Sequence, residues 1–255
     1  MNLREPLWLC LALLNSPRHK TRTLLKRFYL LRRLAKYILP EYRFKWPNMD
    51  WWEDKEFNKY LKRFGELDGN NTDRRYAVDQ LLRLVCAVQG DTAEVGAYGG
   101  AMSWLICKAN AGVRMHHIFD SFEGLSQPSL VDGSHWSKGA LACGEDVVHE
   151  NLSEFSGHFN TYMGWVPARF ADVGNLRFSF VHIDVDLYQP TKESIEFFYS
   201  RMSPGGVLVC DDYRFSSCPG ATKACDDFLA DKPEKMIGLS AGGGFFIKGV
   251  EAAVG

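Results

Sequence analysis

Short apolar stretches rich in β-branched and aromatic residues alternate with longer stretches of helical spacing from about residue 90 onward. Strands are predicted at residues 92–97, 116–120, 160–164, 178–185, 207–211, 235–239 and 244–248. Helices are predicted at residues 74–88, 102–111, 145–155, 191–201 and 221–230. Strands joined through helices over roughly 20–40 residues form right-handed crossovers and therefore a parallel sheet. The last two strands are separated by only a short glycine-rich link, which permits an antiparallel hairpin.

This pattern predicts a doubly wound α/β domain with a seven-stranded sheet whose last strand is antiparallel. The chain has 255 residues, of which 46% are hydrophobic and 24% charged, and this is enough for one large domain. We divide the sequence into a basic amphipathic extension (1–45), a helical lid or cap segment (46–90) and the α/β domain (91–255). The fold is therefore expected to carry an N-terminal helical extension.

The two ends of the chain differ in charge. Residues 1–45 contain 11 basic and 2 acidic residues, a net charge of +9, and the remainder carries −10. Within this arm, residues 24–38 have the spacing of a basic amphipathic helix. Such a helix packs on its own domain, packs on a second copy of the chain in a dimer, docks on an anionic membrane surface, or binds another acidic partner. The apolar stretch 7–14 is about half the length of a membrane span.

Seven cysteines are dispersed along the sequence without a C-x-x-C pair. This pattern is typical of reduced thiols rather than of a disulfide framework or a zinc site. The protein is therefore expected to be cytoplasmic, either free or peripheral to the inner face of the membrane. No nucleic-acid partner is expected.

A glycine-rich turn follows the first predicted strand in the sequence EVGAYGG, with Glu94, Gly96, Gly99 and Gly100. Glycines at this place let the backbone turn tightly beside a ligand. Asp120 ends the second predicted strand, where an acid suits a ribose hydroxyl pair. The two features together indicate an adenosine-containing ligand, either NAD or S-adenosylmethionine. S-adenosylmethionine is favoured because Glu94 occupies the first glycine position of the dinucleotide motif, where an acid can support a cationic methionine end.

Four carboxylates follow two neighbouring predicted strands. Asp184 and Asp186 lie in VHIDVDLYQP, and Asp211 and Asp212 lie in GGVLVCDDY. The carboxyl ends of adjacent parallel strands meet at one edge of a sheet, so these groups are expected to converge and to repel one another unless a cation bridges them. Oxygen ligands select a hard ion, Mg²⁺ or Ca²⁺.

The motifs IDVDLYQPT and CDDY, with GDTAEVGAYGG, FDSFEGL and the Gly164-Trp165 pair followed by Pro167, occur in the order found in a known family. Over roughly residues 66–249 the chain resembles the macrocin O-methyltransferase family of metal-dependent sugar O-methyltransferases. The resemblance implies a class I methyltransferase (Rossmann-like) fold that binds S-adenosylmethionine and Mg²⁺.

The resemblance also implies roles for individual residues. Asp184, Asp211 and Asp212 are expected to hold the metal, and Asp186 is expected to be the general base for the acceptor hydroxyl. Further candidates for cofactor contacts complete the predicted site. The full cofactor set is Thr72, Glu94, Gly96, Tyr98, Ser103, Asp120, Ser121 and Trp165. His182 shares a face with the two acids of its strand, and we interpret it as a core histidine.

The expected function is methylation of a sugar hydroxyl, in a glycoconjugate or a glycosylated natural product. The segments 126–146 and 164–173 differ from the family pattern and would line the acceptor pocket, so the acceptor does not follow from the resemblance. The alternatives are a catechol-type methyltransferase of a phenolic small molecule, a non-catalytic cofactor-binding protein and an NAD-linked oxidoreductase.

Overall fold

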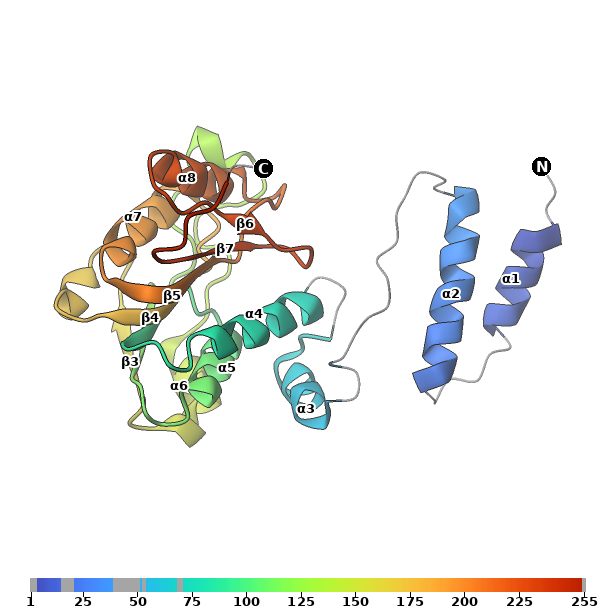
Figure 1. Ribbon diagram of the computed structural model, residues 1–255, viewed down its shortest axis with the longest axis horizontal. Coiled ribbons are helices and arrows are strands. Elements are labelled where there is room, and N and C mark those ends of the chain that lie inside the picture. Colours follow the sequence, from blue (N-terminus) through green and yellow to red (C-terminus); the bar gives the residue numbers. More distant parts are fainter. Residues whose placement is uncertain (1–3, 15–20, 39–50, 52–53, 68–70, 254–255) are drawn as a thin grey trace. The chain divides into compact units, whose positions relative to one another are not determined.

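The computed structural model describes residues 4–14, 21–38, 51, 54–67 and 71–253. The chain divides into two compact units, residues 1–58 and 59–255. In the first unit, helices α1 (Arg4–Leu14) and α2 (Thr21–Ile38) lie side by side (Figure 1). Leu9 is fully buried in this hairpin, and Arg33 and Tyr37 both donate hydrogen bonds to the carboxylate of Glu5. The predicted basic amphipathic helix thus lies within α2.

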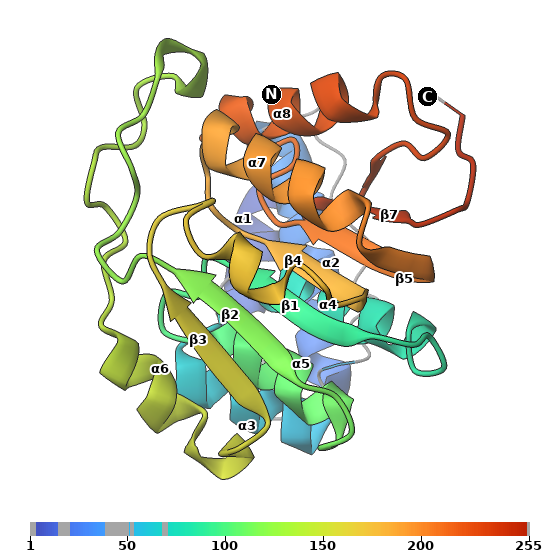
Figure 2. The same ribbon diagram turned by 90° about the vertical axis from the view of Figure 1, so that its left-hand side faces the viewer.

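The second unit is built on one seven-stranded sheet with the order β3-β2-β1-β4-β5-β7-β6 (Figure 2). The strands are β1 (Asp91–Val95), β2 (His116–Asp120), β3 (Phe159–Met163), β4 (Phe178–Ile183), β5 (Met202–Cys210), β6 (Ile237–Gly238) and β7 (Gly244–Ile247). Strands β1 to β5 pair in parallel, and β7 is antiparallel to both β5 and β6. The prediction of a doubly wound sheet with an antiparallel last strand is confirmed.

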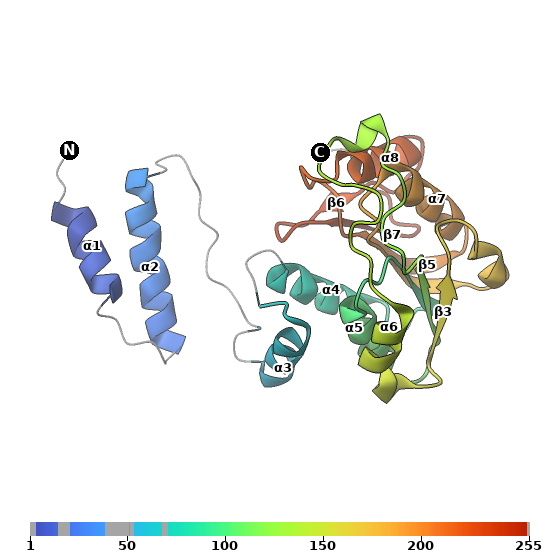
Figure 3. The same cartoon turned by 180° about the vertical axis from the view of Figure 1, so that it is seen from behind.

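Helices cover both faces of this sheet (Figures 1 and 3). The helices that follow α2 are α3 (Lys55–Phe64), α4 (Thr72–Leu84), α5 (Ala101–Asn110), α6 (Glu145–Asn151), α7 (Tyr188–Tyr199) and α8 (Pro219–Leu229). Short 3-10 helices occur at η2 (Leu130–Asp132), η3 (Ser153–Phe155) and η4 (Phe170–Val173). Helices α7 and α8 pack together over one face, and α4 packs with α5 over the other.

Side chains of β4 alternate between the two faces, as the two-residue period of a strand requires. Val181 and Ile183 join the core cluster that includes Ile195 and Phe198 of α7. All six residues of β4 are buried, which suits its mostly apolar composition; the polar exceptions are Ser179 and His182. His182, which lies between Val181 and Ile183, points to the opposite face, where it lies 3.2 Å from the Glu94 carboxylate of β1.

Strand β4 ends at Ile183, two residues before the predicted end. The chain then leaves the sheet, and Asp186 takes a left-handed backbone conformation with φ of 59°. Asp184 and Asp186 therefore belong to the connection between β4 and α7. The acids thus follow the strand rather than lie within it, although Asp186 is still buried.

None of the helices in the described ranges is both long and apolar enough to cross a bilayer.

Candidate active site

A pocket of about 160 Å³ opens at the carboxyl ends of the parallel strands. Seven of the residues predicted from the sequence line it: Gly96, Tyr98, Asp120, Ser121, Trp165, Asp184 and Asp186. The start of α7 contributes Gln189, Pro190 and Glu193 to the same pocket. Open α/β folds bind ligands at the carboxyl ends of their strands, and the pocket of this protein lies at the same place.

The turn after β1 is shaped by residues with positive φ. Gly96 has φ of 86°, and Tyr98, although not a glycine, has φ of 48°. The phenol of Tyr98 is 61% exposed, so this side chain is open to a ligand in the pocket. The turn passes close to the connection after β4, which leaves no room for a side chain at residue 96.

The Asp120 carboxylate holds this turn in place. One of its oxygens accepts hydrogen bonds from the backbone N–H groups of Ala97 (2.7 Å) and Tyr98 (3.1 Å). The other accepts one from the N–H of Phe122 (2.8 Å). A carboxylate has about four acceptor positions, so Asp120 keeps capacity for a ligand hydroxyl. Its orientation is fixed before any ligand arrives.

Two further predicted cofactor residues lie on the loops that follow β2 and β3. The Ser121 hydroxyl donates a hydrogen bond to the carbonyl of Gly124 (2.8 Å), and the Trp165 indole donates to the same carbonyl (3.0 Å). Trp165 is 40% exposed. Its ring is thus anchored at the nitrogen and open to the pocket, an arrangement that suits stacking on a base.

The three remaining cofactor candidates are turned toward the protein interior. Glu94 accepts a hydrogen bond from Ser103, and both side chains are fully buried. Thr72, at the start of α4, donates its hydroxyl hydrogen bond to the carbonyl of Glu66 (2.7 Å). Glu94, Ser103 and Thr72 do not line the pocket. Their contact with a cofactor stays a prediction.

The four acids predicted to converge fall into two groups of potential ligand atoms. His182, Asp184 and Asp211 form one group, and Asp186, Asp212 and Cys218 form the other, with the atoms of each group within 4.8 Å of one another. An Asp212 oxygen accepts a hydrogen bond from the backbone N–H of Asp186 (2.8 Å). Asp212 is thus directed toward the predicted base, whereas Asp184 and Asp211 face each other.

Burial and mutual repulsion perturb three of these carboxyls. Burial, followed by the charges of Asp211 and Asp212, raises the pKa of Asp184 well above its ordinary value. Burial and the Asp184 charge raise the pKa of Asp186 to about 7. Burial and the Asp186 charge raise the pKa of Asp212 to about 8. Buried carboxylates that repel one another in this way are a site that a cation would stabilise. The oxygens of Asp184 and Asp211 fit Mg²⁺, but their group also holds a His182 nitrogen, and Asp212 belongs to the second group, with Asp186 and Cys218.

Asp211 differs from its neighbours because it already has cationic partners. Burial would raise the pKa of its carboxyl, but the nearby His182 ring and the charges of Arg75 and Arg74 hold it below its ordinary value. Arg74 of α4 lies 2.6 Å from one Asp211 oxygen, and His182 lies 3.5 Å from the other.

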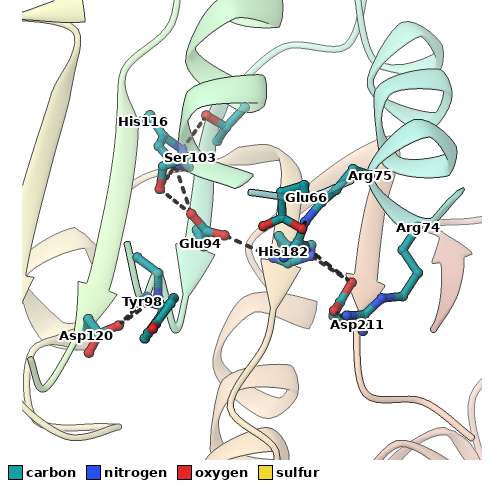
Figure 4. A network of polar contacts seen from close by, with 12 residues as sticks. Glu66, Arg74, Arg75, Glu94, Tyr98, Ser103, His116, Asp120, His182 and Asp211 are labelled. Carbon is teal, nitrogen blue, oxygen red and sulfur yellow. Dashed lines mark hydrogen bonds and ion pairs between the residues drawn. The ribbon is translucent and has the colours of Figure 1, made fainter. Parts of the chain in front are cut away.

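A buried polar network connects this carboxylate to β1 (Figure 4). His182 lies between Glu94 (3.2 Å) and Asp211 (3.5 Å) and has no exposed surface. Burial opposes protonation of the ring, but the nearby carboxylates of Asp211 and Glu94 raise the pKa of His182 to about 10. Burial would raise the pKa of Glu94, yet His116 and His182 lower it to about 2. His182 thus lies between two buried acids whose charges favour its protonated form.

Sequence reasoning missed two residues of the site, Arg74 and Cys218. Cys218 precedes α8, and its thiol donates a hydrogen bond to the Asp186 carboxylate (3.3 Å). The indole of Trp136 donates in turn to the Cys218 sulfur (3.4 Å). No local pattern marks either residue. The pairing of Arg74 with Asp211 joins positions 137 residues apart.

Comparison with known proteins places this site in a family. The sequence model of the Macrocin-O-methyltransferase (TylF) family matches residues 74–237. The chain is 28% identical over 165 residues to 8-demethyl-8-(2,3-dimethoxy-alpha-L-rhamnosyl)-tetracenomycin-C 4'-O-methyltransferase of Streptomyces olivaceus, a match that covers 58% of this chain and 61% of the relative. It is 27% identical over 163 residues to mycinamicin III 3''-O-methyltransferase of Micromonospora griseorubida, covering 56% of this chain and 62% of that protein. The chain thus spans less than two thirds of the length of these relatives.

Solved structures show the same fold. The O-methyltransferase NovP matches with a TM-score of 0.59 and 22% identity, over 70% of this chain and 80% of that chain. The calicheamicin methyltransferase CalS11 matches with a TM-score of 0.63 and 20% identity, over 93% of this chain and 96% of that chain. The seven-stranded fold is therefore that of class I O-methyltransferases. With a family match that covers the first parallel strand, the glycine turn and all four acids, the chain belongs to the macrocin O-methyltransferase family.

Proposed function

We propose that this protein is an O-methyltransferase that uses S-adenosylmethionine and Mg²⁺ to methylate a hydroxyl of a sugar, in a glycoconjugate or a glycosylated natural product. The observation that carries the proposal is the position of Asp186. Its buried carboxylate lines the same pocket as Asp120 and lies beside the acids that fit a hard cation. The sugar-modifying names of the curated relatives support the acceptor class.

A sugar hydroxyl is too weakly acidic to act as a nucleophile at neutral pH. S-adenosylmethionine, when bound, supplies a methyl group on a sulfonium, and Mg²⁺, when bound, lowers the pKa of a coordinated hydroxyl. Asp184, Asp211 and Asp212 are the residues we propose to hold the metal. Asp120 and Trp165 are the ones we propose to orient the cofactor through its ribose and its adenine.

Asp186 takes the proton of the acceptor hydroxyl in this mechanism. A general base has to lie within reach of the proton that it takes, and the Asp186 carboxylate lines the pocket in which the acceptor would lie. The thiol of Cys218 and the carboxylate of Asp212 fix this residue at its side chain and its backbone N–H. The strained backbone of Asp186 is thereby held with its carboxylate toward the pocket.

A methyl-transfer screen over nucleotide sugars, glycolipids and catechols, with and without Mg²⁺, tests the proposal. We expect methylation of a sugar-containing acceptor only when Mg²⁺ is present. If only catechols were methylated, the acceptor would be a phenol and not a sugar. If the protein bound NAD and not S-adenosylmethionine, the proposal would be refuted.

We further propose that the protein is a cytoplasmic homodimer assembled through the hairpin of α1 and α2. Large apolar side chains on α1 are exposed, namely Leu7, Trp8, Leu11 and Leu14. Their spacing puts them on one side of the helix, where a second copy would cover them. The seven free cysteines suit a reducing compartment. Contact with an anionic membrane surface is the alternative use of this basic hairpin.

A further inference from the structure

Arg74 forms an ion pair with one carboxylate oxygen of Asp211, the Oδ2 atom. Its Nη1 atom lies 2.6 Å from Asp211 Oδ2, and the Arg74 side chain is 15% exposed. The other oxygen, Oδ1, faces His182 at 3.5 Å and Arg75 at 3.9 Å. Both oxygens of this predicted metal ligand are thus already next to positive charge (Figure 4).

Asp211 is in this respect unlike the other carboxylates of the site. Asp211 lies 2.6 Å from the Arg74 guanidinium and 3.9 Å from that of Arg75. Asp212 instead accepts a hydrogen bond from the backbone N–H of Asp186 (2.8 Å). One carboxylate of the cluster therefore carries a counter-charge from the protein, while its neighbours repel one another.

We propose that Arg74 is the protein's own counter-ion for Asp211 and competes with the divalent cation for this carboxylate. A metal that binds Asp211 through Oδ2 would have to share this oxygen with the guanidinium or displace it. The guanidinium also repels a cation placed a few ångströms away, and little solvent screens this repulsion because the site is buried. Arg74 thereby lowers the affinity for the metal and stabilises the metal-free state.

The surroundings of Arg74 allow it to withdraw without losing all of its partners. Its second terminal nitrogen donates a hydrogen bond to Asn71 Oδ1 (2.6 Å). Its guanidinium carbon lies 4.9 Å from the ring centroid of Phe215. Arg74 can keep these contacts with Asn71 and Phe215 when Asp211 binds a metal. Arg75 lacks such freedom, because it is buried between Glu66 and Asp211.

The inference rests on the proposed function, since it assumes that Asp211 is a metal ligand. Isothermal titration calorimetry with MgCl₂ on the full chain, without cofactor or acceptor, tests it directly. We expect Arg74→Gln to bind Mg²⁺ about tenfold more tightly than the natural protein. Arg74→Lys keeps a positive charge near Asp211 and is expected to lie between the two.

Arg83 provides the matched control. It lies on the same helix α4, its side chain is 70% exposed, and it pairs with Asp79 one turn away. Arg83→Gln removes the same charge from the same helix, and we expect it to leave Mg²⁺ affinity unchanged. A gain of similar size in Arg83→Gln would show a general charge effect and overturn the inference.

Thermal unfolding supplies a second readout that does not depend on catalysis. With EDTA, Arg74→Gln is expected to unfold at a lower temperature than the natural protein, and Mg²⁺ is expected to stabilise the variant more than the natural protein. Equal or weaker Mg²⁺ binding by Arg74→Gln would overturn the inference alone. If neither protein bound Mg²⁺, the inference and the metal-dependent mechanism would both fall.

Discussion

Gly96 lies directly against the backbone of Asp184: a Cβ atom on Gly96 would be 1.9 Å from the Asp184 carbonyl oxygen. The N–H of Asp184 donates a hydrogen bond to the carbonyl of Val95, which fixes this approach (2.8 Å). The turn that we expect to bind the cofactor and the loop that carries the proposed metal ligand Asp184 and the proposed base Asp186 are therefore in contact through their backbones. Any side chain at residue 96 would push the two apart.

Gly96→Ala is expected to lower the free energy of unfolding by at least about 3 kcal/mol, because clash and a positive φ act together. Gly99→Ala is the control, since a Cβ there meets nothing within 4 Å. We expect that change to stay within about 0.5 kcal/mol. Urea unfolding of the two variants measures the difference. Equal stabilities would mean that the approach of residue 96 to Asp184 is looser than described.

Asp120→Ala is expected to weaken S-adenosylmethionine binding by about 1–3 kcal/mol, since the charge-assisted hydrogen bonds to the ribose are lost. Asp120 also holds three backbone N–H groups, so part of this loss would come from the turn itself. Asp120→Asn keeps an acceptor at the same place and should lose less. Calorimetric titration with the cofactor measures both. Unchanged affinity in Asp120→Ala would remove this residue from the site.

Chelation with EDTA is expected to abolish methyl transfer, and added Mg²⁺ is expected to restore it. Asp186→Asn should lower kcat by at least about 100-fold, because the amide cannot accept the proton. Cofactor affinity should stay close to that of the natural protein. Initial rates and calorimetry separate the two effects. Full activity in both EDTA and Asp186→Asn would refute the proposed mechanism.

The lowered pKa of Glu234 makes the stability of the protein depend on pH, independently of the active site. Its buried carboxylate accepts hydrogen bonds from Tyr199 (2.6 Å), the Gly249 N–H (2.8 Å) and Lys248 (3.0 Å). Burial alone would raise the pKa of Glu234, but these hydrogen bonds lower it to about 2 from an ordinary value of 4.5. Stabilisation by this ionised group is therefore complete above about pH 4.5 and is lost as the pH falls toward 2.

Glu234→Gln should consequently unfold at a lower temperature than the natural protein at pH 6, and the difference should shrink toward pH 3. Glu251→Gln, at an exposed position, serves as the control. Melting curves across this pH range measure the effect. A constant difference between Glu234→Gln and the natural protein would assign the loss to packing rather than to ionisation.

A variant that lacks residues 1–45 separates the two uses of the basic arm. If the hairpin forms a dimer, the variant becomes monomeric or aggregates, and the full chain does not bind anionic liposomes. If it docks on a membrane, the variant stays folded and active on soluble acceptor, and only the full chain sediments with liposomes. Analytical ultracentrifugation and liposome sedimentation measure these outcomes.

The sequence by itself determined the sheet and the place of the site. Apolar strands that alternate with helices require parallel crossovers, and the ends of neighbouring parallel strands meet at one edge. Gly96, Asp120, Asp184 and Asp186 follow such strands, and all four line the pocket. These features depend on the local period and on chain order, which a single sequence displays directly.

Only the tertiary structure decided which groups face each other at that edge. Strand alternation puts Glu94 and His182 on a shared face, but the distance between them depends on how β1 and β4 pair. Asp211 and Asp212 are adjacent in sequence, yet one meets Arg74 and His182 and the other meets the backbone of Asp186. Helix α4 brings Arg74 to a carboxylate 137 residues away. Such partners are chosen by packing between distant elements, because buried charges pair with whichever opposite charge the fold brings near them.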